Sequence, residues 1–235
     1  MATPRFVLLH SPLLGPMAWQ PTADELVRRG HAVESPAWPR LATIAERFYP
    51  ALADGVAAQL ASVSDPLVLV AHSGAGALIP ALTARMPRES VRVIYADALL
   101  PHPGRSWFDT APLEMRERLR NGALMGDLPT WDEWWPPGAL ERLVPDAPTR
   151  ETLIAELEPL PLVYFEEPAP SDLYRGPAAY LQLSGAYDDE GVAAGRYGWP
   201  RVRLPLHHLA MLTDPQPVAA ALESLAERLT EPDHG

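Results

Sequence analysis

The sequence predicts a three-layer α/β fold, in which a mostly parallel sheet of about six strands has helices on both faces and a helical cap is inserted in it. Short apolar segments with strand character alternate along the chain with segments of helical spacing, which is typical of parallel sheets covered on both faces. One such strand, Leu67–Ala71, passes without a linker into a Gly- and Ala-rich turn. A proline-rich segment at about 101–176 interrupts the alternation.

The elements of the sheet follow in a regular order. A strand over Arg5–Leu9 opens the chain, and Trp19–Arg29 has the apolar spacing of a helix that Gly30 closes. Further short apolar strands are expected over His31–Glu34, Leu67–Ala71, Val91–Ala96, Ala179–Leu183 and Val202–Leu206. Ala-rich or amphipathic spacing predicts helices over Ile44–Val63, from Gly74 to about Met86, and from about Pro215 to Leu229. Ligands of such sheets bind at the carboxyl ends of the strands.

The segment 101–176 is expected to form the cap, and residues 1–100 with 177–235 the core, within one structural domain. Prolines separate its helical pieces, which we place at Leu113–Arg120, Ala139–Leu143 and Thr149–Leu157. Four tryptophans of the cap either attach it to the core or line a substrate pocket: Trp107, Trp131, Trp134 and Trp135. As a group they favour a pocket for an apolar or aromatic substrate.

Composition excludes several classes of protein. The chain has 235 residues with 47% hydrophobic composition, which is enough to bury the core of one domain. Its formal net charge of −11 opposes binding to nucleic acid. Because it contains no cysteine, it has no disulfide, no thiolate nucleophile and no cysteine metal site.

Residues 1–5 lead directly into the first strand, and no basic segment followed by an apolar one precedes it. The chain also lacks a segment of about 20 apolar residues. We therefore expect a soluble, cytoplasmic protein whose partner is a small-molecule substrate, with neither nucleic acid nor a membrane as a partner. A homodimer is left open.

The turn after Leu67–Ala71 indicates a serine nucleophile. Ser73 stands between Ala71 and Ala75, and a serine on a tight strand-to-helix turn needs small residues at these two positions because the backbones pack closely. The turn lifts the hydroxyl above the sheet edge, and the N–H of Gly74 faces an oxyanion. The alternative is a Gly- and Ala-rich turn with an incidental serine.

This turn resembles the nucleophile elbow of the α/β-hydrolases. Nearly the whole chain is similar to their compact branch, which contains plant methylesterases and hydroxynitrile lyases and shows a His-x-x-x-x-Gly-x-x-x-Trp pattern, here His10–Trp19. The resemblance implies that Gly74 and the loop after His10 surround the oxyanion. It also implies substrate contacts from the Ser11 hydroxyl, with Pro12 beside it, and leaves open a direct role for His72.

The resemblance further implies a catalytic histidine after the last strand, where His207 and His208 stand. In this fold the histidine commonly precedes by six residues the acidic residue of an Asp-Pro step that starts the last helix. Counting back from Asp214 in this chain selects His208. Either histidine alone is equally compatible with a structural imidazole.

An acidic residue should orient this histidine. Asp188 is the first choice, because it follows the strand Ala179–Leu183 in a turn that resembles the Gly-x-x-Asp turn of the family. Asp97 is the alternative, since it lies at the carboxyl end of the strand after the nucleophile, where some hydrolases place their acid. Asp189 is a third candidate.

Pro12 departs from the family pattern. The second oxyanion donor usually belongs to this position, and proline has no backbone N–H. Loss of one oxyanion donor costs roughly 10²–10³ in kcat. Either the N–H of Leu13 or the hydroxyl of Ser11 takes its place, or the reaction needs no full oxyanion hole.

These residues predict acyl transfer to water. His208 takes the proton of Ser73 as it attacks an ester or thioester carbonyl, and Asp188 orients the imidazole. No metal or cofactor is expected. The alternative is a non-hydrolytic biosynthetic enzyme, a lyase, cyclase or other proton-transfer catalyst, in which Ser73 and His208 act without an acyl-enzyme. A binding-only role, as in hydrolase-fold hormone receptors, is a third reading, because fold alone does not fix function.

Overall fold

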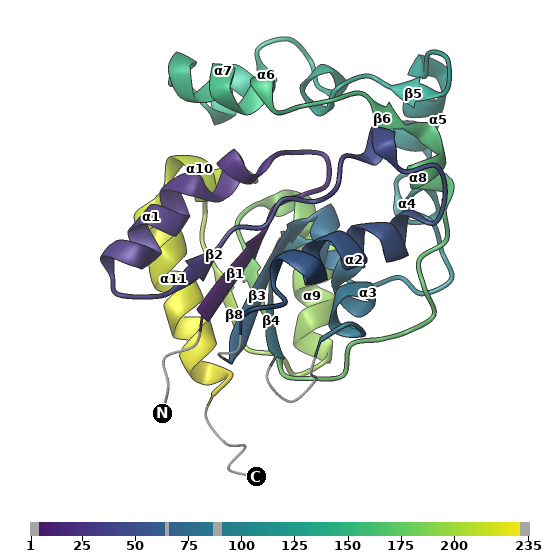
Figure 1. The fold of residues 1–235 in the computed structure, drawn as a ribbon. Coiled ribbons are helices and arrows are strands. Elements are labelled where there is room, and N and C mark those ends of the chain that lie inside the picture. Colours follow the sequence, from purple (N-terminus) through teal and green to yellow (C-terminus); the bar gives the residue numbers. More distant parts are fainter. Residues whose placement is uncertain (1–4, 64–65, 87–90, 231–235) are drawn as a thin grey trace.

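The computed structural model describes residues 5–63, 66–86 and 91–230 and has the predicted layered α/β architecture (Figure 1). Its main sheet has six strands, all paired in parallel, in the order β2-β1-β3-β4-β7-β8. The strands are β1 (Arg5–Leu9), β2 (Val33–Glu34), β3 (Leu67–Ser73), β4 (Val91–Ala98), β7 (Ala178–Gln182) and β8 (Arg201–Arg203). Residues 1–4, where we expected no targeting segment, lie outside the described residues.

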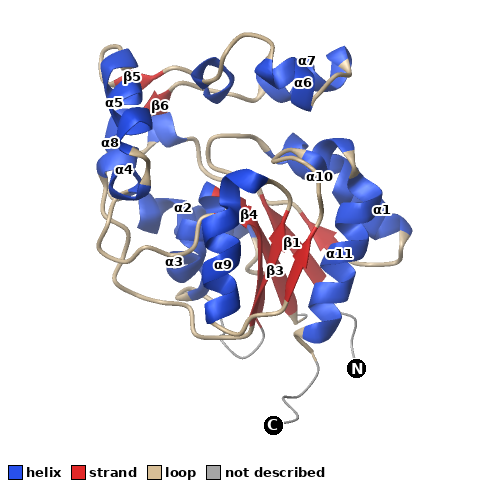
Figure 2. Ribbon diagram, turned by 180° about the vertical axis from the view of Figure 1, so that it is seen from behind, coloured by secondary structure: helices blue, strands red, loops and turns tan. Residues whose placement is uncertain are grey.

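Helices cover both faces of the sheet (Figures 1 and 2). One face carries α1 (Gln20–Arg28) and α11 (Pro215–Arg228), and the other carries α2 (Phe48–Gln59), α3 (Ile79–Thr83) and α9 (Asp188–Arg196). Because both faces are covered, every residue of β3 is buried. No described helix is long and apolar enough to cross a membrane.

The helices α2 and α9 differ from the sequence prediction. The helix expected from Ile44 begins only at Phe48, because Arg47 has a left-handed backbone with φ of 58° and interrupts the helical path. The helix α9 was not predicted, since its sequence is polar and includes Gly191 and Gly195, which are poor helix formers.

In the segment expected as the cap, residues 101–176, the part from 107 to 166 lies over the carboxyl end of the sheet (top of Figure 1), whereas residues 172–176 run beside the helix of residues 79–83 to the start of β7. The cap is built from short elements because prolines interrupt it. These are α4 (Trp107–Thr110), α5 (Leu113–Gly122), β5 (Asp127–Leu128), α6 (Ala139–Leu143), α7 (Ala147–Ala155), β6 (Leu160–Pro161) and α8 (Leu162–Glu166), with β5 and β6 forming an antiparallel pair.

Carboxylates of the cap form hydrogen bonds to the core. Glu167 accepts hydrogen bonds from the backbone N–H groups of Phe48 and Tyr49, at 2.9 and 3.1 Å, in the first turn of α2. Glu156 accepts one from the N–H of Met17 at 3.0 Å. The first N–H groups of a helix have no partner within the helix and favour negative charge, so these contacts stabilise the packing of the cap on the core.

Candidate active site

Ser73 ends β3 in a strained conformation. Its φ of 55° and ψ of −126° lie outside the regions that residues other than glycine adopt readily. The neighbours Ala71 and Ala75 are fully buried, which agrees with the close packing expected at this turn. Strain of this kind costs of order 1–3 kcal/mol and persists where the surrounding structure imposes it, often at functional sites.

A β-bulge places Asp97 opposite this turn. His72 pairs with Ala96 and Ser73 with Ala98, so Asp97 is the extra residue on β4. Its backbone is left-handed, with φ of 45°. A bulge redirects a side chain, and here it turns the carboxylate of Asp97 away from the regular alternation of the strand.

The buried Tyr180 holds the backbone beside this bulge. Its hydroxyl donates to the carbonyl oxygen of Ala98 at 2.8 Å and accepts from the N–H of the same residue at 3.1 Å. These two bonds satisfy backbone groups next to Asp97, and they favour the conformation that presents its carboxylate.

The carboxylate of Asp97 is fully buried and hydrogen-bonded on both oxygens. Its Oδ2 lies 2.8 Å from Nδ1 of His208 and accepts from the Ser184 hydroxyl at 2.6 Å, while Oδ1 accepts from the N–H groups of Leu183 and Ser184 at 2.9 Å. Burial raises the pKa of Asp97, but the hydrogen bonds from His208, Ser184 and Leu183 outweigh it and leave the pKa below its usual value. Asp97 is therefore an anion at neutral pH.

The imidazole of His208 lies between two other rings. The ring of His72 packs at a centroid distance of 4.4 Å, and that of Tyr187 stacks at 5.1 Å with an interplanar angle of 12°. His72 also donates from Nε2 to the carbonyl oxygen of His208 at 2.9 Å, and burial lowers the pKa of His72, which keeps it neutral. Because a carboxylate only accepts, Nδ1 of His208 carries the proton and Nε2 is free to take one.

Asp188, the first choice of acid, does not contact His208. It lies at the start of α9, where it bonds to the side-chain amide of Gln182 and lies 3.2 Å from Arg203. It lines a separate cavity of about 440 Å³ between α9 and β8. The chain enters a helix directly after Tyr187, and this carries the Asp188 side chain away from the imidazole. The geometry favours the alternative, Asp97.

His207 occupies a different environment from His208. Its Nε2 lies 3.0 Å from the hydroxyl of Thr213 and 3.7 Å from the carboxylate of Asp214. These contacts stabilise the loop that leads to α10 (Ala210–Thr213) and α11. Of the two histidines, it is His208 that the structure pairs with Asp97.

The loop after β1 brings Ser11 beside the serine turn. A Cβ placed on Gly74 would lie 3.5 Å from both the Ser11 hydroxyl and the ring of Pro12. The N–H of Leu13 donates to the Ser11 hydroxyl at 3.3 Å. His10 donates from Nδ1 to the Ser11 carbonyl at 2.8 Å, and burial lowers the pKa of His10 to about 4, so this support is a neutral imidazole.

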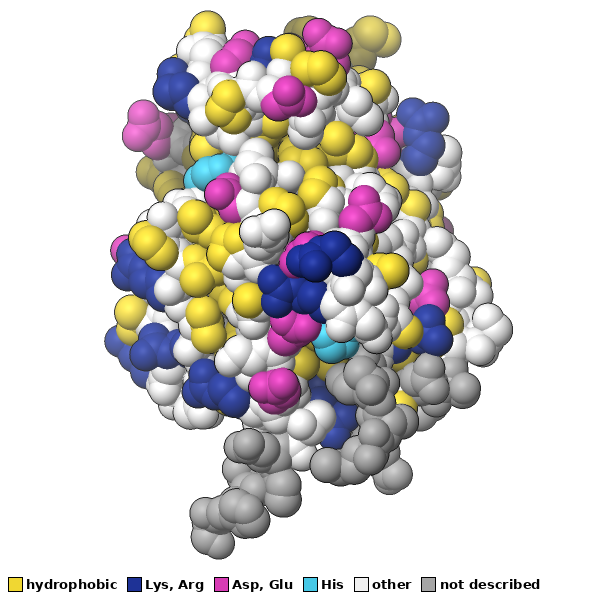
Figure 3. Space-filling model, turned by 90° about the vertical axis from the view of Figure 1, so that its left-hand side faces the viewer, with side chains coloured by type: hydrophobic (Ala, Val, Ile, Leu, Met, Phe, Trp, Pro, Cys, Tyr) yellow, Lys and Arg dark blue, Asp and Glu magenta, His cyan; other side chains and the backbone are white. Residues whose placement is uncertain are grey.

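A cavity of about 650 Å³ opens between the cap and the carboxyl end of the sheet. On the face shown in Figure 3, hydrophobic side chains gather where the cap meets the core. Ser73, Gly74, Leu13 and His208 line the cavity on the core side. Its remaining lining includes the four tryptophans expected at the substrate, Trp107, Trp131, Trp134 and Trp135, and the polar residues Arg142, Asp189 and Glu190.

Three residues expected at the substrate do not line this cavity. Ser11 and Pro12 are buried behind Gly74, in contact with the turn. His72 is fully buried beneath His208, where its ring packs against the imidazole and also, edge-on, against Trp19. Ser11 and Pro12 therefore meet the site at Gly74, where an oxyanion would lie, and His72 meets it through the imidazole of His208.

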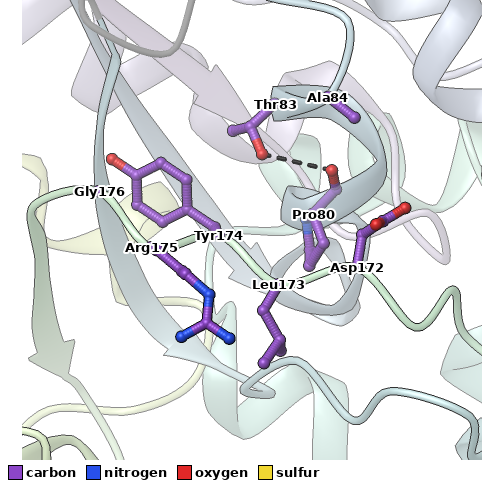
Figure 4. A pocket seen from close by; sticks show the side chains of 8 residues that line it. All are labelled: Pro80, Thr83, Ala84, Asp172, Leu173, Tyr174, Arg175 and Gly176. Carbon is purple, nitrogen blue, oxygen red and sulfur yellow. Dashed lines mark hydrogen bonds between the residues drawn. The ribbon is translucent and has the colours of Figure 1, made fainter.

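A smaller cavity of about 240 Å³ lies between α3 and the segment before β7 (Figure 4). Its hydroxyl groups are bonded within the fold: Thr83 donates to the carbonyl oxygens of Ile79 and Pro80, and Tyr174 donates to that of Val91. It contains neither Ser73 nor His208, so the larger cavity is the candidate site.

Tyr187 is a residue of the site that the sequence analysis missed. Its hydroxyl lies 3.2 Å from Oγ of Ser73, and its ring stacks on His208. The one sequence signal was its position in the turn after β7, next to the candidate acids Asp188 and Asp189. Among the described residues, no group of three or more His, Asp or Glu side chains is placed to hold a metal ion.

The structure is similar to solved structures of α/β-hydrolases. An extracellular α/β-hydrolase from a Paenibacillus species, described as sharing structural and functional homology with tobacco salicylic acid binding protein 2, has a TM-score of 0.77 at 20% identity over 95% of this chain and 99% of its own. Polyneuridine aldehyde esterase has a TM-score of 0.74 at 17% identity over 96% and 100%. A variant of tomato methylketone synthase I complexed with β-ketoheptanoate has a TM-score of 0.71 at 15% identity over 98% and 100%.

No protein-family model matches the sequence, and no curated protein matches it either. At these identities the structural likeness shows the fold, and the expected α/β-hydrolase fold is confirmed. The cytoplasmic location stays a prediction.

Proposed function

We propose that this chain, which has the α/β-hydrolase fold, is a serine-dependent hydrolase of small, largely apolar or aromatic esters or thioesters. One observation carries the proposal. Ser73, held in the strained turn, lines the same cavity as His208, and the imidazole of His208 is bonded through Nδ1 to the buried anion of Asp97. With Nδ1 bonded to a carboxylate, Nε2 is the nitrogen of His208 that can take a proton.

In the acylation step, Oγ of Ser73 forms a bond to the carbonyl carbon, and its proton passes to Nε2 of His208. The negative charge of Asp97 stabilises the imidazolium. The N–H of Gly74, with the loop of Ser11 and Leu13, holds the oxyanion. When the C–O or C–S bond breaks, its electron pair stays on the leaving atom, which takes the proton from His208.

In the second step, water gives a proton to His208 and attacks the acyl group on Ser73. The acid product leaves as Oγ regains its proton. The cavity of about 650 Å³ fits small substrates, and its tryptophans favour apolar or aromatic acyl groups.

The test is a set of initial rates of hydrolysis over aryl esters and thioesters whose acyl groups are aliphatic, aromatic or charged. We expect saturable hydrolysis, with a higher kcat/KM for aliphatic and aromatic acyl groups than for charged ones, because most of the side chains that line the cavity are aliphatic or aromatic. Rates equal to those without protein across the whole set would contradict the proposal.

Replacing Ser11 by alanine is expected to lower kcat/KM about 100-fold. The reason is that Pro12 has no N–H, whereas the Ser11 hydroxyl lies beside Gly74 and bonds to the N–H of Leu13. The measurement is kcat/KM for an aryl ester, with thermal unfolding as the check on folding. An unchanged kcat/KM would show that the oxyanion does not depend on this hydroxyl.

Because Pro12 has no N–H to complete an oxyanion hole, a second function is compatible with the site. It is that of a non-hydrolytic enzyme of the same fold, which catalyses a lyase, cyclase or other proton-transfer reaction. In such reactions Ser73 and His208 act together as a general base, and no full oxyanion hole is needed. The similarity in fold to methylketone synthase I agrees with this reading but does not select it. Background rates over the ester and thioester set would favour it.

A further inference from the structure

Tyr187 touches both members of the proposed Ser73–His208 pair. Its hydroxyl lies 3.2 Å from Oγ of Ser73, and its ring lies parallel to the imidazole at 5.1 Å. It also lines the cavity of about 650 Å³. A hydroxyl at this point has direct access to the atoms that react when Ser73 is acylated.

The position of Tyr187 relative to the serine turn indicates which substrate atom its hydroxyl can reach. The oxyanion side of the turn is marked by Ser11 and Pro12, which pack against Gly74. Tyr187 instead lies on the imidazole side, stacked on His208. The group that must come next to His208 during acylation is the leaving oxygen, because it takes the proton of the imidazolium.

We propose that the Tyr187 hydroxyl donates a hydrogen bond to the leaving oxygen of the substrate ester during acylation of Ser73. This inference rests on the proposed hydrolase function. In the free protein the hydroxyl bonds to Ser73 Oγ, and when that oxygen bonds to the carbonyl carbon the donor turns to the leaving oxygen. Tyr187 transfers no proton: the C–O bond breaks, its electron pair stays on the leaving oxygen, and the proton comes from His208.

The phenol stays protonated in this role. Burial raises the pKa of Tyr187, although the hydrogen bond to Ser73 opposes this, so the group is a donor throughout the pH range of an assay.

The test is Tyr187→Phe, which removes the hydroxyl and keeps the ring against His208. The substrates are the p-nitrophenyl and benzyl esters of butyric acid, which share one acyl group. A good leaving group such as p-nitrophenolate needs little help from a donor, whereas a benzyl alkoxide needs much. The measured quantity is kcat/KM, because it reports acylation and not the later release of the acid.

We expect Tyr187→Phe to lower kcat/KM for the benzyl ester by about 10- to 100-fold and to leave the p-nitrophenyl ester nearly unchanged. The matched control is Tyr197→Phe, an exposed tyrosine that does not line the cavity, which should leave both esters unchanged. An equal fall for both esters, or no fall for either, would overturn the proposal, because a merely structural role of the hydroxyl does not depend on the leaving group.

Ser73→Ala, measured on the same two esters, separates the two ways in which the account can fail. If this variant keeps turnover, the proposed function fails and the inference fails with it. If it abolishes turnover while Tyr187→Phe does not discriminate between the esters, the inference alone is wrong.

Discussion

Replacing Asp97 by asparagine is expected to lower kcat for an aryl ester by about 10⁴-fold while the fold survives. The amide has nearly the shape of the carboxylate, and its oxygen can still accept from the N–H groups of Leu183 and Ser184. It carries no charge, however, and can hold the imidazole of His208 in the wrong tautomer. The measurement is kcat together with thermal unfolding of both proteins.

The control for this prediction is Asp188→Asn, because Asp188 contacts Gln182 and Arg203 and lines a different cavity. We expect its kcat to remain that of the parent protein. If the Asp188 variant lost activity and the Asp97 variant kept it, the assignment of the acid would be reversed.

Replacing Ser73 by alanine is expected to reduce turnover by roughly 10⁴–10⁶-fold, since no other nucleophile stands in its place. Alanine keeps the strained backbone, so stability should change little. Ser73→Gly should lose the same activity and raise the free energy of unfolding by about 1 kcal/mol, because glycine adopts positive φ readily. Full turnover by either variant would contradict acyl transfer through Ser73.

The fold and the serine turn could be predicted because their signals are local. The apolar strand before Ser73, the small residues around it and the proline-rich interruption that forms the cap are all contiguous in the sequence. The spacing to Asp214 likewise selected His208, the histidine that lies against Asp97.

The choice of acid could not be made from the sequence. Asp188 has the expected spacing, but the helix α9 that begins there turns its side chain outward. Asp97 reaches His208 only because of a bulge in β4, which depends on pairing with β3 and on the distant hydroxyl of Tyr180. No pattern near residue 97 signals this bulge.

Tyr187 was missed for the same reason. Its stacking on His208 joins a turn after β7 to a loop after β8, and contacts between separate loops leave no periodic signal. The small residues Ala71 and Ala75 predicted the tight turn at Ser73, but they could not show which aromatic ring packs on His208.

The most direct test of the central claim, that Ser73 is an activated nucleophile, is to treat the protein with an aryl phosphonate and map the adduct by mass spectrometry. We expect one phosphonyl group per chain, on Ser73, and no adduct in Ser73→Ala at the same reagent concentration. An unmodified parent protein, or an adduct on a residue other than Ser73, would contradict it.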